Sequence, residues 1–396
     1  MQYRFSDNVN GLKPSAIREI LKHSSQPGMI PFSAGNPSAE AFPVEAVRKI
    51  SAEIFKDEPI AALQYSVTEG YTPLRQLLTD YLKTKHHIGT EQDEFLITSG
   101  AQQVMSLAAK VLLNRGDTVL CEDPSFIGSL NSFRSYGIQL KGVPMEADGM
   151  NMRALEQLLN SDSRVRFIYT IPNFQNPTGI TMSLAKRRRL YELAVQHGVV
   201  IIEDDPYGEL RFKGEFLPAI KSFDTEGAVI YSGSFSKVLA PGIRVGYAVA
   251  NRQLLSKMTV CKQTDDVHTG IFSQMLAYRF MKEYDFEAHL TKLRAIYRQK
   301  AELAMRCAQE SFGNLVSFYP VEGGLFLWCR LPEQINMLEF CKKGIENGVA
   351  VVPGTAFLAN EEAMTQCFRV NFSTPSEEQI KTGFATLGNL VKEMLQ

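Results

Sequence analysis

Short apolar runs rich in β-branched residues alternate along the middle of the chain with longer segments whose apolar residues recur at helical spacing. This alternation predicts a sheet whose strands are joined by crossover helices. We expect strands at residues 93–99, 117–123, 138–144, 164–172, 198–205, 228–234 and 243–250. The pattern therefore predicts an α/β fold, with a large domain built on a mainly parallel seven-stranded sheet flanked by helices.

Helical patterns fill the spaces between these strands, for example at residues 102–116 and 184–198, where Gly198 is the expected C-terminal cap. From 273 to 313 the sequence predicts one long helical stretch. Three more apolar runs, 323–331, 348–354 and 367–373, then predict a smaller sheet.

A chain of 396 residues exceeds the usual size of one compact core, which predicts two lobes. The first 40 or so residues are too few for a core of their own, so we expect them to pack on the C-terminal lobe. The expected organisation is an N-terminal segment (1–45), a large domain (46–290) and a small α+β domain (291–396) to which both termini contribute.

A formal net charge of -1 gives no electrostatic reason to expect nucleic acid or an anionic membrane as a partner, so the expected partner is a small molecule. The six cysteines include no CxxC pair, which argues against a metal site or a disulfide framework and favours a reducing cytoplasm. We find no apolar signal core at the N-terminus and no apolar run long enough to cross a bilayer, so a cytoplasmic location is expected.

Polar residues follow the expected strands at their carboxyl ends, where open parallel sheets bind ligands. Each of them alone has an ordinary explanation, such as a helix start, a turn, a cap, a packed tyrosine or a solvated lysine. Their occurrence at successive strand ends favours a binding site. They are Ala101 and Gln102 in SGAQQ, Asn176 in NFQNPTG, Asp204 and Tyr207 in EDDPYGEL, and Ser234, Ser236, Lys237 and Arg244 in GSFSKVLAPGIR.

Together these residues supply the groups that pyridoxal phosphate requires. Lys237 can provide the amine for a Schiff base, and Asp204 can hold a proton on the pyridine nitrogen. Asn176 and Tyr207 can donate hydrogen bonds to the phenolic oxygen. The sequence therefore predicts pyridoxal 5′-phosphate as the cofactor.

The remaining residues suit the two other parts of this cofactor. Ser234, Ser236, Arg244 and the SGAQQ turn can surround a phosphate, because helix starts and arginine bind anions. Phe126 can offer an aromatic face to the ring. A P-loop is excluded because Lys237 is followed by Val238, and no GxGxxG stands between a strand and a helix.

The chain resembles the fold-type I pyridoxal-phosphate aminotransferases of the aspartate aminotransferase superfamily, within the branch that holds 2-aminoadipate and kynurenine aminotransferases and the catalytic-like domains of MocR-type regulators. The resemblance covers nearly the whole chain. The motifs that carry it are IPFSAGNPSAEAFP, LQYSVTEGYTPLR, TSGAQQ, EDPSF, NFQNPTG, EDDPYGEL, GSFSKVLAPGIRVGY, GGLFLW and FRVNFS.

The resemblance implies roles at the cofactor. Lys237 corresponds to the Schiff-base lysine that shuttles a proton between Cα and C4′, and Asp204 to the partner of the pyridine nitrogen. Ala101 and Gln102 are expected at the phosphate. Phe126 departs from the tyrosine common in this branch, which keeps ring stacking and loses a hydroxyl contact.

The resemblance also implies a substrate site and an assembly. Arg369 corresponds to an arginine that clamps the substrate carboxylate with its planar fork, and Gly35 and Asn176 match positions near that carboxylate. Without the resemblance, Arg369 would be taken as an exposed sheet residue. Tyr65 corresponds to a tyrosine that reaches the phosphate in the neighbouring subunit, which implies a homodimer with shared active sites.

The function expected from this resemblance is transfer of an amino group from an L-amino acid to a 2-oxo acid, with 2-oxoglutarate as the expected acceptor in a ping-pong mechanism. A C–S β-lyase or a decarboxylase would retain Lys237, Asp204 and Arg244, so the motifs leave both open. An effector-binding regulatory module is disfavoured because only about 30 residues precede PFSAGNP. Dicarboxylic, aromatic and branched-chain donors remain open, and the family branch favours 2-aminoadipate or aromatic amino acids.

Overall fold

The computed structural model of the chain describes residues 1, 3–6 and 28–396. Its larger sheet has the strand order β1-β8-β7-β6-β5-β2-β3-β4. Strands β2, β3, β5, β6 and β7 run parallel, whereas β8 is antiparallel to both of its neighbours. The strands are β1 (Asp93–Thr98), β2 (Thr118–Asp123), β3 (Gln139–Glu146), β4 (Gly149–Met150), β5 (Val165–Thr170), β6 (Val200–Asp204), β7 (Val229–Ser234) and β8 (Gly246–Asn251).

This sheet confirms the predicted α/β fold and contains all seven expected strands. Two details differ. The sheet gains β4, a two-residue strand antiparallel to β3 that is too short to leave a periodic signal. Strand β8 also begins at Gly246 rather than at residue 243, because Pro241–Ile243 form a 3-10 turn and Arg244 has a left-handed backbone with φ 51°.

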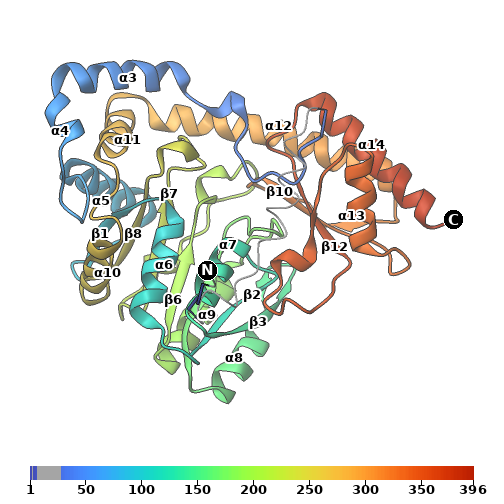
Figure 1. Cartoon of the computed structure of the whole chain (residues 1–396), viewed down its shortest axis with the longest axis horizontal. Helices are drawn as coiled ribbons and strands as arrows, with labels where there is room; N and C mark the ends of the chain where they lie inside the picture. Colours follow the sequence, from blue (N-terminus) through green and yellow to red (C-terminus); the bar gives the residue numbers. More distant parts are fainter. Residues whose placement is uncertain (2, 7–27) are drawn as a thin grey trace.

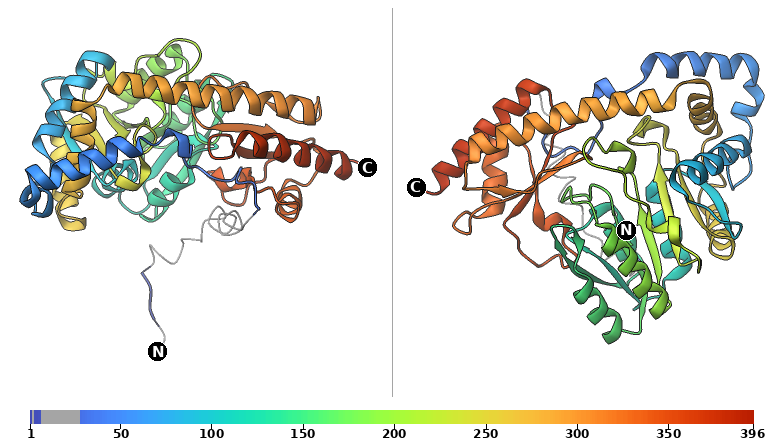
Figure 2. Two further views of the ribbon diagram at one scale, coloured as in Figure 1. Left: turned by 90° about the horizontal axis from the view of Figure 1, so that it is seen from above. Right: turned by 180° about the vertical axis from the view of Figure 1, so that it is seen from behind.

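Helices cover both faces of the larger sheet (Figures 1 and 2). On β5 the side chain of Ile168 packs with the apolar residues of α8 and α9, while Phe167 and Tyr169 belong to the core on the other face. This alternation is the period-two pattern of a strand buried on both sides. The helices associated with this sheet are α3 (Val44–Asp57), α4 (Pro59–Leu63), α5 (Thr72–His86), α6 (Ala101–Leu112), α7 (Ile127–Arg134), α8 (Met152–Ser161), α9 (Leu184–His197), α10 (Arg252–Asp265) and α11 (Ile271–Glu283).

Two helix predictions have different outcomes. Gly198 caps α9 as expected, with a left-handed φ of 63° and its N–H bonded to the carbonyls of Ala194 and Val195. The long stretch 273–313 is divided, because α11 ends at Glu283 and α12 (Phe286–Phe312) begins after Asp285, whose side chain accepts a hydrogen bond from the N–H of Ala288. An aspartate N-cap inside a continuous helical pattern was the signal for this break.

The smaller sheet is antiparallel and has the order β11-β12-β10-β9. It contains the three expected strands, and the short β9 joins them. Helix α12 passes from the larger sheet to this one, where it packs along α14 (Figure 1). The elements are β9 (Ser317–Phe318), β10 (Phe326–Arg330), α13 (Met337–Glu346), β11 (Val352–Pro353), β12 (Cys367–Asn371) and α14 (Glu377–Met394).

The described part of the predicted N-terminal segment lies against this smaller sheet. Ile30 forms a parallel bridge with Val349, and the carbonyl of Phe32 accepts a 2.7 Å hydrogen bond from the N–H of Asn371. The ring of Phe32 packs on Phe384 of α14. Residues 2 and 7–27 of that segment lie outside the described residues.

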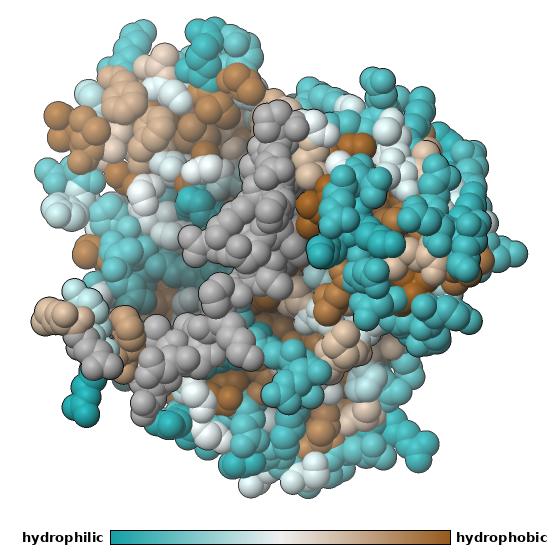
Figure 3. Space-filling view, turned by 45° about the vertical axis from the view of Figure 1, so that its right-hand side comes forward, coloured by the Kyte–Doolittle hydropathy of each residue, from teal (hydrophilic) through white to brown (hydrophobic). Residues whose placement is uncertain are grey.

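The hydropathy of the surface differs between regions of the molecule. Figure 3 shows a mostly hydrophilic surface over the C-terminal helices at the right, while apolar residues gather at the upper left. Among the described helices, none is long and apolar enough to cross a membrane.

Candidate active site

The polar residues at the strand ends meet around one cavity of about 380 Å³. It lies at the carboxyl ends of β5, β6 and β7, where the sequence pattern places a ligand. The predicted site residues that line it are Gly35, Ala101, Gln102, Phe126, Asn176, Asp204, Tyr207, Ser234, Ser236, Lys237, Arg244 and Arg369. Of the residues singled out by sequence, this set omits Tyr65.

Lys237 follows β7 and extends its amine across the cavity. Its Nζ donates a 2.7 Å hydrogen bond to the carbonyl of Gly35. Burial, and then the positive charges of Arg369 and Arg244, lower the pKa of Lys237 to about 8. A lysine with such a pKa offers a neutral, nucleophilic amine near neutral pH.

Asp204 ends β6 and is buried. Its Oδ2 accepts a 2.8 Å hydrogen bond from the hydroxyl of Tyr169, while its buried Oδ1 has no partner among the described residues. Burial, which outweighs the hydrogen bond from Tyr169, and the charge of the neighbouring Asp205 raise the pKa of Asp204 to about 7. An unpartnered buried carboxylate oxygen requires a donor, and a protonated pyridine nitrogen is one.

Tyr169 was missed by sequence reasoning. It sits inside an apolar β5 run and reads as a core aromatic, and its ring does pack against Phe133 of α7. Only the placement of β5 beside β6 shows that its hydroxyl faces Asp204.

Asn176 and Tyr207 stand beside each other above the sheet. The Nδ2 of Asn176 lies 3.5 Å from the hydroxyl of Tyr207, and its Oδ1 accepts a 2.9 Å hydrogen bond from Arg369. Both residues are buried, and burial raises the pKa of Tyr207. The phenol therefore stays protonated and can donate to a ligand oxygen.

The opposite end of the cavity is suited to an anion. Gly100 has φ 77° and precedes α6, whose first turn carries N–H groups that have no partner inside the helix. A Cβ on Gly100 would lie 2.2 Å from a guanidinium nitrogen of Arg244. Arg244 is exposed and lies 3.4 Å from the hydroxyl of Ser236, and its other nitrogen donates to the carbonyl of Ser99.

Two other predicted residues complete this end. The side chain of Gln102 is engaged with the carbonyl of Gly128 and the hydroxyl of Ser132, so its backbone N–H is the group left for an anion. The half-buried ring of Phe126 lines the cavity beside Gly128, where a Cβ would lie 2.6 Å from that ring.

Arg369 comes from β12 of the smaller sheet and is buried, which corrects the expectation of an exposed residue that would hold without the resemblance. One terminal nitrogen donates to Asn176 and the other to the carbonyls of Ser33 and Ala34. Its Nε has no partner among the described residues. The guanidinium lies over the ring of Phe326, and burial lowers the pKa of Arg369 to about 10. A buried, incompletely bonded guanidinium is suited to a carboxylate.

Tyr65 lies away from this cavity. Its side chain is 82% exposed on the segment after α4, and its ring packs edge to face against His268. The described chain thus does not bring Tyr65 together with the other predicted residues.

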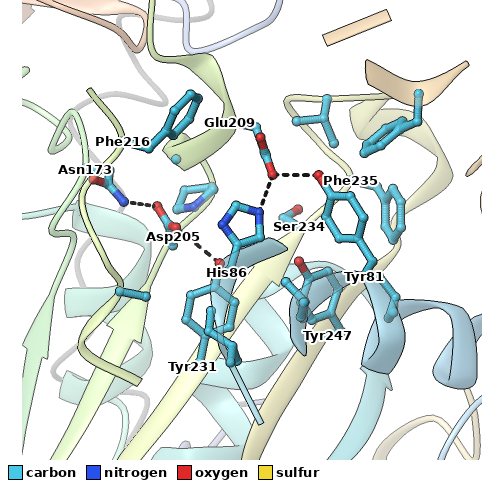
Figure 4. Close-up of a pocket in the computed structure, with 18 of the residues that line it drawn as sticks. Tyr81, His86, Asn173, Asp205, Glu209, Phe216, Tyr231, Ser234, Phe235 and Tyr247 are labelled. Carbon is cyan, nitrogen blue, oxygen red and sulfur yellow. Dashed lines mark hydrogen bonds and ion pairs between the residues drawn. The ribbon is translucent and has the colours of Figure 1, made fainter. Parts of the chain in front are cut away.

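A second, smaller cavity of about 60 Å³ adjoins the site, because Pro206 and Ser234 line both cavities. Asp205 accepts hydrogen bonds there from Asn173 and Tyr231, and Glu209 accepts them from His86 and Tyr81 (Figure 4). These contacts join the segment after β6 to the loop after β5, to β7 and to α5. They were not predicted from sequence.

Comparisons with known proteins identify the family of the chain. The model of the family described as aminotransferase class I and II matches residues 27–387. The aromatic-amino-acid aminotransferase 1 of Thermococcus litoralis is 37% identical, covering 99% of this chain and 95% of its own. The 2-aminoadipate transaminase of Thermus thermophilus is 38% identical, covering 99% and 97%.

Solved structures show the same likeness. A kynurenine aminotransferase of Pyrococcus horikoshii, solved in complex with PMP, superposes with a TM-score of 0.95 at 36% identity, covering 99% of this chain and 98% of its own. An alpha-aminoadipate aminotransferase of Thermus thermophilus, complexed with N-(5'-phosphopyridoxyl)-L-leucine, has a TM-score of 0.91 at 37% identity with the same coverage.

The cavity fits the cofactor of this family. It offers a free amine, a buried carboxylate oxygen that lacks a donor, and a helix start beside an arginine. These features match an aldehyde, a pyridine nitrogen and a phosphate. The chain belongs to the class I and II aminotransferases and is a fold-type I transaminase whose cofactor is pyridoxal 5′-phosphate.

Proposed function

We propose that this transaminase moves the amino group of an L-amino acid to 2-oxoglutarate in a ping-pong mechanism. The observation that carries the proposal is the shared contact of Lys237 and Arg369 with one segment. Lys237 bonds the carbonyl of Gly35, and Arg369 bonds the carbonyls of Ser33 and Ala34. A substrate carboxylate held by Arg369 would therefore bring its α-carbon close to the amine of Lys237.

Each residue near the cofactor ring has its own proposed role in the transfer. When bound, pyridoxal phosphate supplies an electron sink that acidifies the α C–H bond of the amino acid. Lys237, with its pKa lowered to about 8, removes this proton and returns it on the other side of the transfer. Asp204 keeps the ring nitrogen protonated through its free Oδ1. Asn176 and Tyr207 donate to the phenolic oxygen.

The phosphate would be held by Ser234, Ser236, Arg244 and the N–H groups of Ala101 and Gln102. Phe126, which lines the same cavity, would offer its aromatic face to the ring. Burial of Arg369 strengthens its attraction for the substrate carboxylate, because the surroundings screen charge weakly.

For the donor, we propose aromatic amino acids or 2-aminoadipate. The relatives are named for aromatic amino acids, 2-aminoadipate and kynurenine. Met105, Ile127, Ile171 and Phe326 line the cavity and provide apolar surface for a donor side chain.

We further propose a homodimer in which Tyr65 reaches the phosphate in the partner subunit. Tyr65 is 82% exposed, and Ile60, Leu63 and Val67 beside it are 74%, 73% and 53% exposed. Such a run of exposed apolar side chains is typical of a surface that another chain covers. We also propose a cytoplasmic location, which the six unpaired cysteines support.

The test is the visible absorption spectrum of the purified protein during addition of single L-amino acids without an oxo acid. Transamination predicts that the band of bound pyridoxal phosphate converts to that of pyridoxamine phosphate and returns on adding 2-oxoglutarate. Conversion by aromatic amino acids or 2-aminoadipate would identify the donor. Release of ammonia and pyruvate without an oxo acid would instead indicate β-lyase chemistry, and release of carbon dioxide would indicate a decarboxylase.

A further inference from the structure

A buried lysine outside the cavity has an unusually complete set of partners. Lys262 of α10 is fully buried, and its Nζ donates to the Oε1 of Gln103 at 2.7 Å, to both oxygens of Asp266 at 2.8 and 2.9 Å, and to the hydroxyl of Thr269 at 3.0 Å. A buried ammonium group is tolerated only when it is paired and hydrogen-bonded. We call Ser99, Gln103, Lys262, Asp266 and Thr269 the lysine cluster.

The lysine cluster holds Ser99 by two different groups. The hydroxyl of Ser99 donates to the Oδ2 of Asp266 at 2.9 Å, and its backbone N–H donates to the Oε1 of Gln103 at 2.8 Å. The Nε2 of Gln103 donates to the same oxygen of Asp266 at 2.8 Å. Lys262 and Asp266 thus orient the amide of Gln103, and the three side chains together fix the backbone of Ser99.

Fixing Ser99 determines the start of α6. Gln103 is the third residue after the N-cap Gly100, and its side chain reaches back past the helix start to the N–H of Ser99. The carbonyl of Ser99 accepts a 3.2 Å hydrogen bond from Arg244. Ser99 is thus bonded to the lysine cluster through its N–H and hydroxyl, and to Arg244 through its carbonyl. The N–H groups of Ala101 and Gln102 are left to face the cavity.

The loop after α10 is strained where it enters the lysine cluster. Val267 has φ 64°, a left-handed conformation that is rare for a β-branched residue and persists only where the surroundings enforce it. Its neighbour Asp266 is held through its backbone N–H, which bonds the carbonyl of Lys262, and through its side chain. The left-handed residue thus directly follows a residue that is bonded through both its backbone and its side chain.

We propose that Lys262 and Asp266 are positioning residues that hold the turn Ser99–Gln102 in the geometry that binds the phosphate of the cofactor. Neither side chain lines the cavity. The proposal rests on the phosphate site proposed above and adds that this site is held in place by residues outside the cavity, through Gln103 and Ser99.

The chain offers a matched control one residue away. Asp265 also ends α10, but its side chain is 38% exposed and forms an ion pair with Lys110 at 2.6 Å on the surface. Asp266→Asn removes a partly buried charge, 29% exposed, that bonds Lys262, Ser99 and Gln103, whereas Asp265→Asn removes a charge at the same helix end that pairs with Lys110 outside the lysine cluster. Any effect of overall charge is common to both variants.

The experiment compares two ligands, pyridoxal 5′-phosphate and pyridoxal, which lacks the phosphate. Dissociation constants are measured by absorption titration of the cofactor-free protein. Asp266→Asn is expected to raise the constant for pyridoxal phosphate by about tenfold, as for loss of a charged hydrogen bond, and to leave that for pyridoxal within about twofold. Asp265→Asn should leave both within about twofold of the unchanged protein.

The outcomes separate the two proposals. If Asp266→Asn weakens both ligands equally, or neither, the positioning role is wrong while the phosphate site stands. If the unchanged protein binds pyridoxal as tightly as pyridoxal phosphate, the phosphate site itself is wrong, and the inference falls with it. Should Asp266→Asn fail to fold, Ser99→Ala removes one contact of the lysine cluster, and the same selective loss for pyridoxal phosphate is expected on a smaller scale.

Discussion

At the scale of single residues, the site contains buried side chains whose hydrogen bonding within the protein is incomplete. Asp204 and Arg369 are both buried, and each has one polar atom without a partner among the described residues. Such atoms cost free energy unless a ligand satisfies them. The cofactor and the substrate carboxylate therefore restore hydrogen bonds that the protein alone lacks.

The lowered pKa of Lys237 leads to a prediction for the cofactor-free protein. Only the neutral amine attacks an aldehyde, and the fraction of neutral Lys237 increases as the pH rises through about 8. The rate at which pyridoxal phosphate forms its visible band should accordingly rise between pH 7 and pH 9 and then level off. A stopped-flow pH series checks this expectation. A rate that continues to rise toward pH 10.5, the ordinary value for lysine, would contradict it.

For Arg369 we predict an effect on substrates rather than on the cofactor. Arg369→Lys keeps the charge but loses the planar fork that bonds Asn176 and the carbonyls of Ser33 and Ala34. The KM for both amino acid and oxo acid should rise by about tenfold or more, with a smaller change in kcat. Steady-state kinetics with both substrates measure the split. An unchanged KM together with a lowered kcat would remove Arg369 from substrate binding.

At the scale of elements, the positions of the strands place the site, and glycines allow its tightest contacts. Gly100 combines a φ of 77° with a potential Cβ only 2.2 Å from Arg244. Gly198 has a similar φ of 63° at the end of α9, with no atom within 4 Å of its potential Cβ. The two glycines share a conformation and differ in surroundings.

This contrast predicts different results for two alanine variants. Gly198→Ala should cost about 1 kcal/mol of unfolding free energy and leave cofactor binding unchanged. Gly100→Ala should in addition displace Arg244 and raise the dissociation constant of pyridoxal phosphate by about tenfold or more. Denaturant unfolding and absorption titration of both variants test this. Equal cofactor affinity in the two variants would show that the close approach of Arg244 is not needed.

Most of the strands and the place of the site could be predicted from the sequence, because period-two runs and strand-end motifs are local signals. The sequence predicted every strand of the larger sheet except β4, and twelve of the residues that it named line one cavity, although Ser33, Asn36, Pro206, Pro241 and Phe326 of the same motifs were not named. Tyr169 and Lys262 were not predicted, because the local sequence around each one shows only a strand or a helix and no sign of its partners. Their partners lie on other elements, and only the assembled fold brings them together.

At the scale of the whole molecule, the site depends on parts that are distant in sequence. Lys237 follows β7 of the larger sheet and Arg369 lies on β12 of the smaller one, and α12 passes from one sheet to the other (Figure 1). We retain the division into 1–45, 46–290 and 291–396 as a proposal, and note that residues 290 and 291 lie within α12. The proposed homodimer extends this dependence to a second chain.

The proposed dimer predicts complementation between one inactive and one weakened variant. Lys237→Ala should abolish turnover because the amine is lost, and Tyr65→Ala should weaken the phosphate site of the partner. A dimer of one copy of each has one intact site, so random mixing after co-refolding should recover about a quarter of the unaltered activity. Activity measured against mixing ratio checks this. No recovery, with mixed dimers demonstrated by tagged subunits, would place Tyr65 outside the partner's site.

Three consecutive residues bond both cationic side chains of the site: the carbonyls of Ser33 and Ala34 bond Arg369, and the carbonyl of Gly35 bonds Lys237. These carbonyls keep both cationic groups hydrogen-bonded to the protein itself. An arriving carboxylate has to compete with them, which lowers affinity and eases product departure. The segment therefore competes with ligands for hydrogen bonds. Shifting it by one residue would change the hydrogen bonds of the Lys237 amine and of the Arg369 guanidinium together.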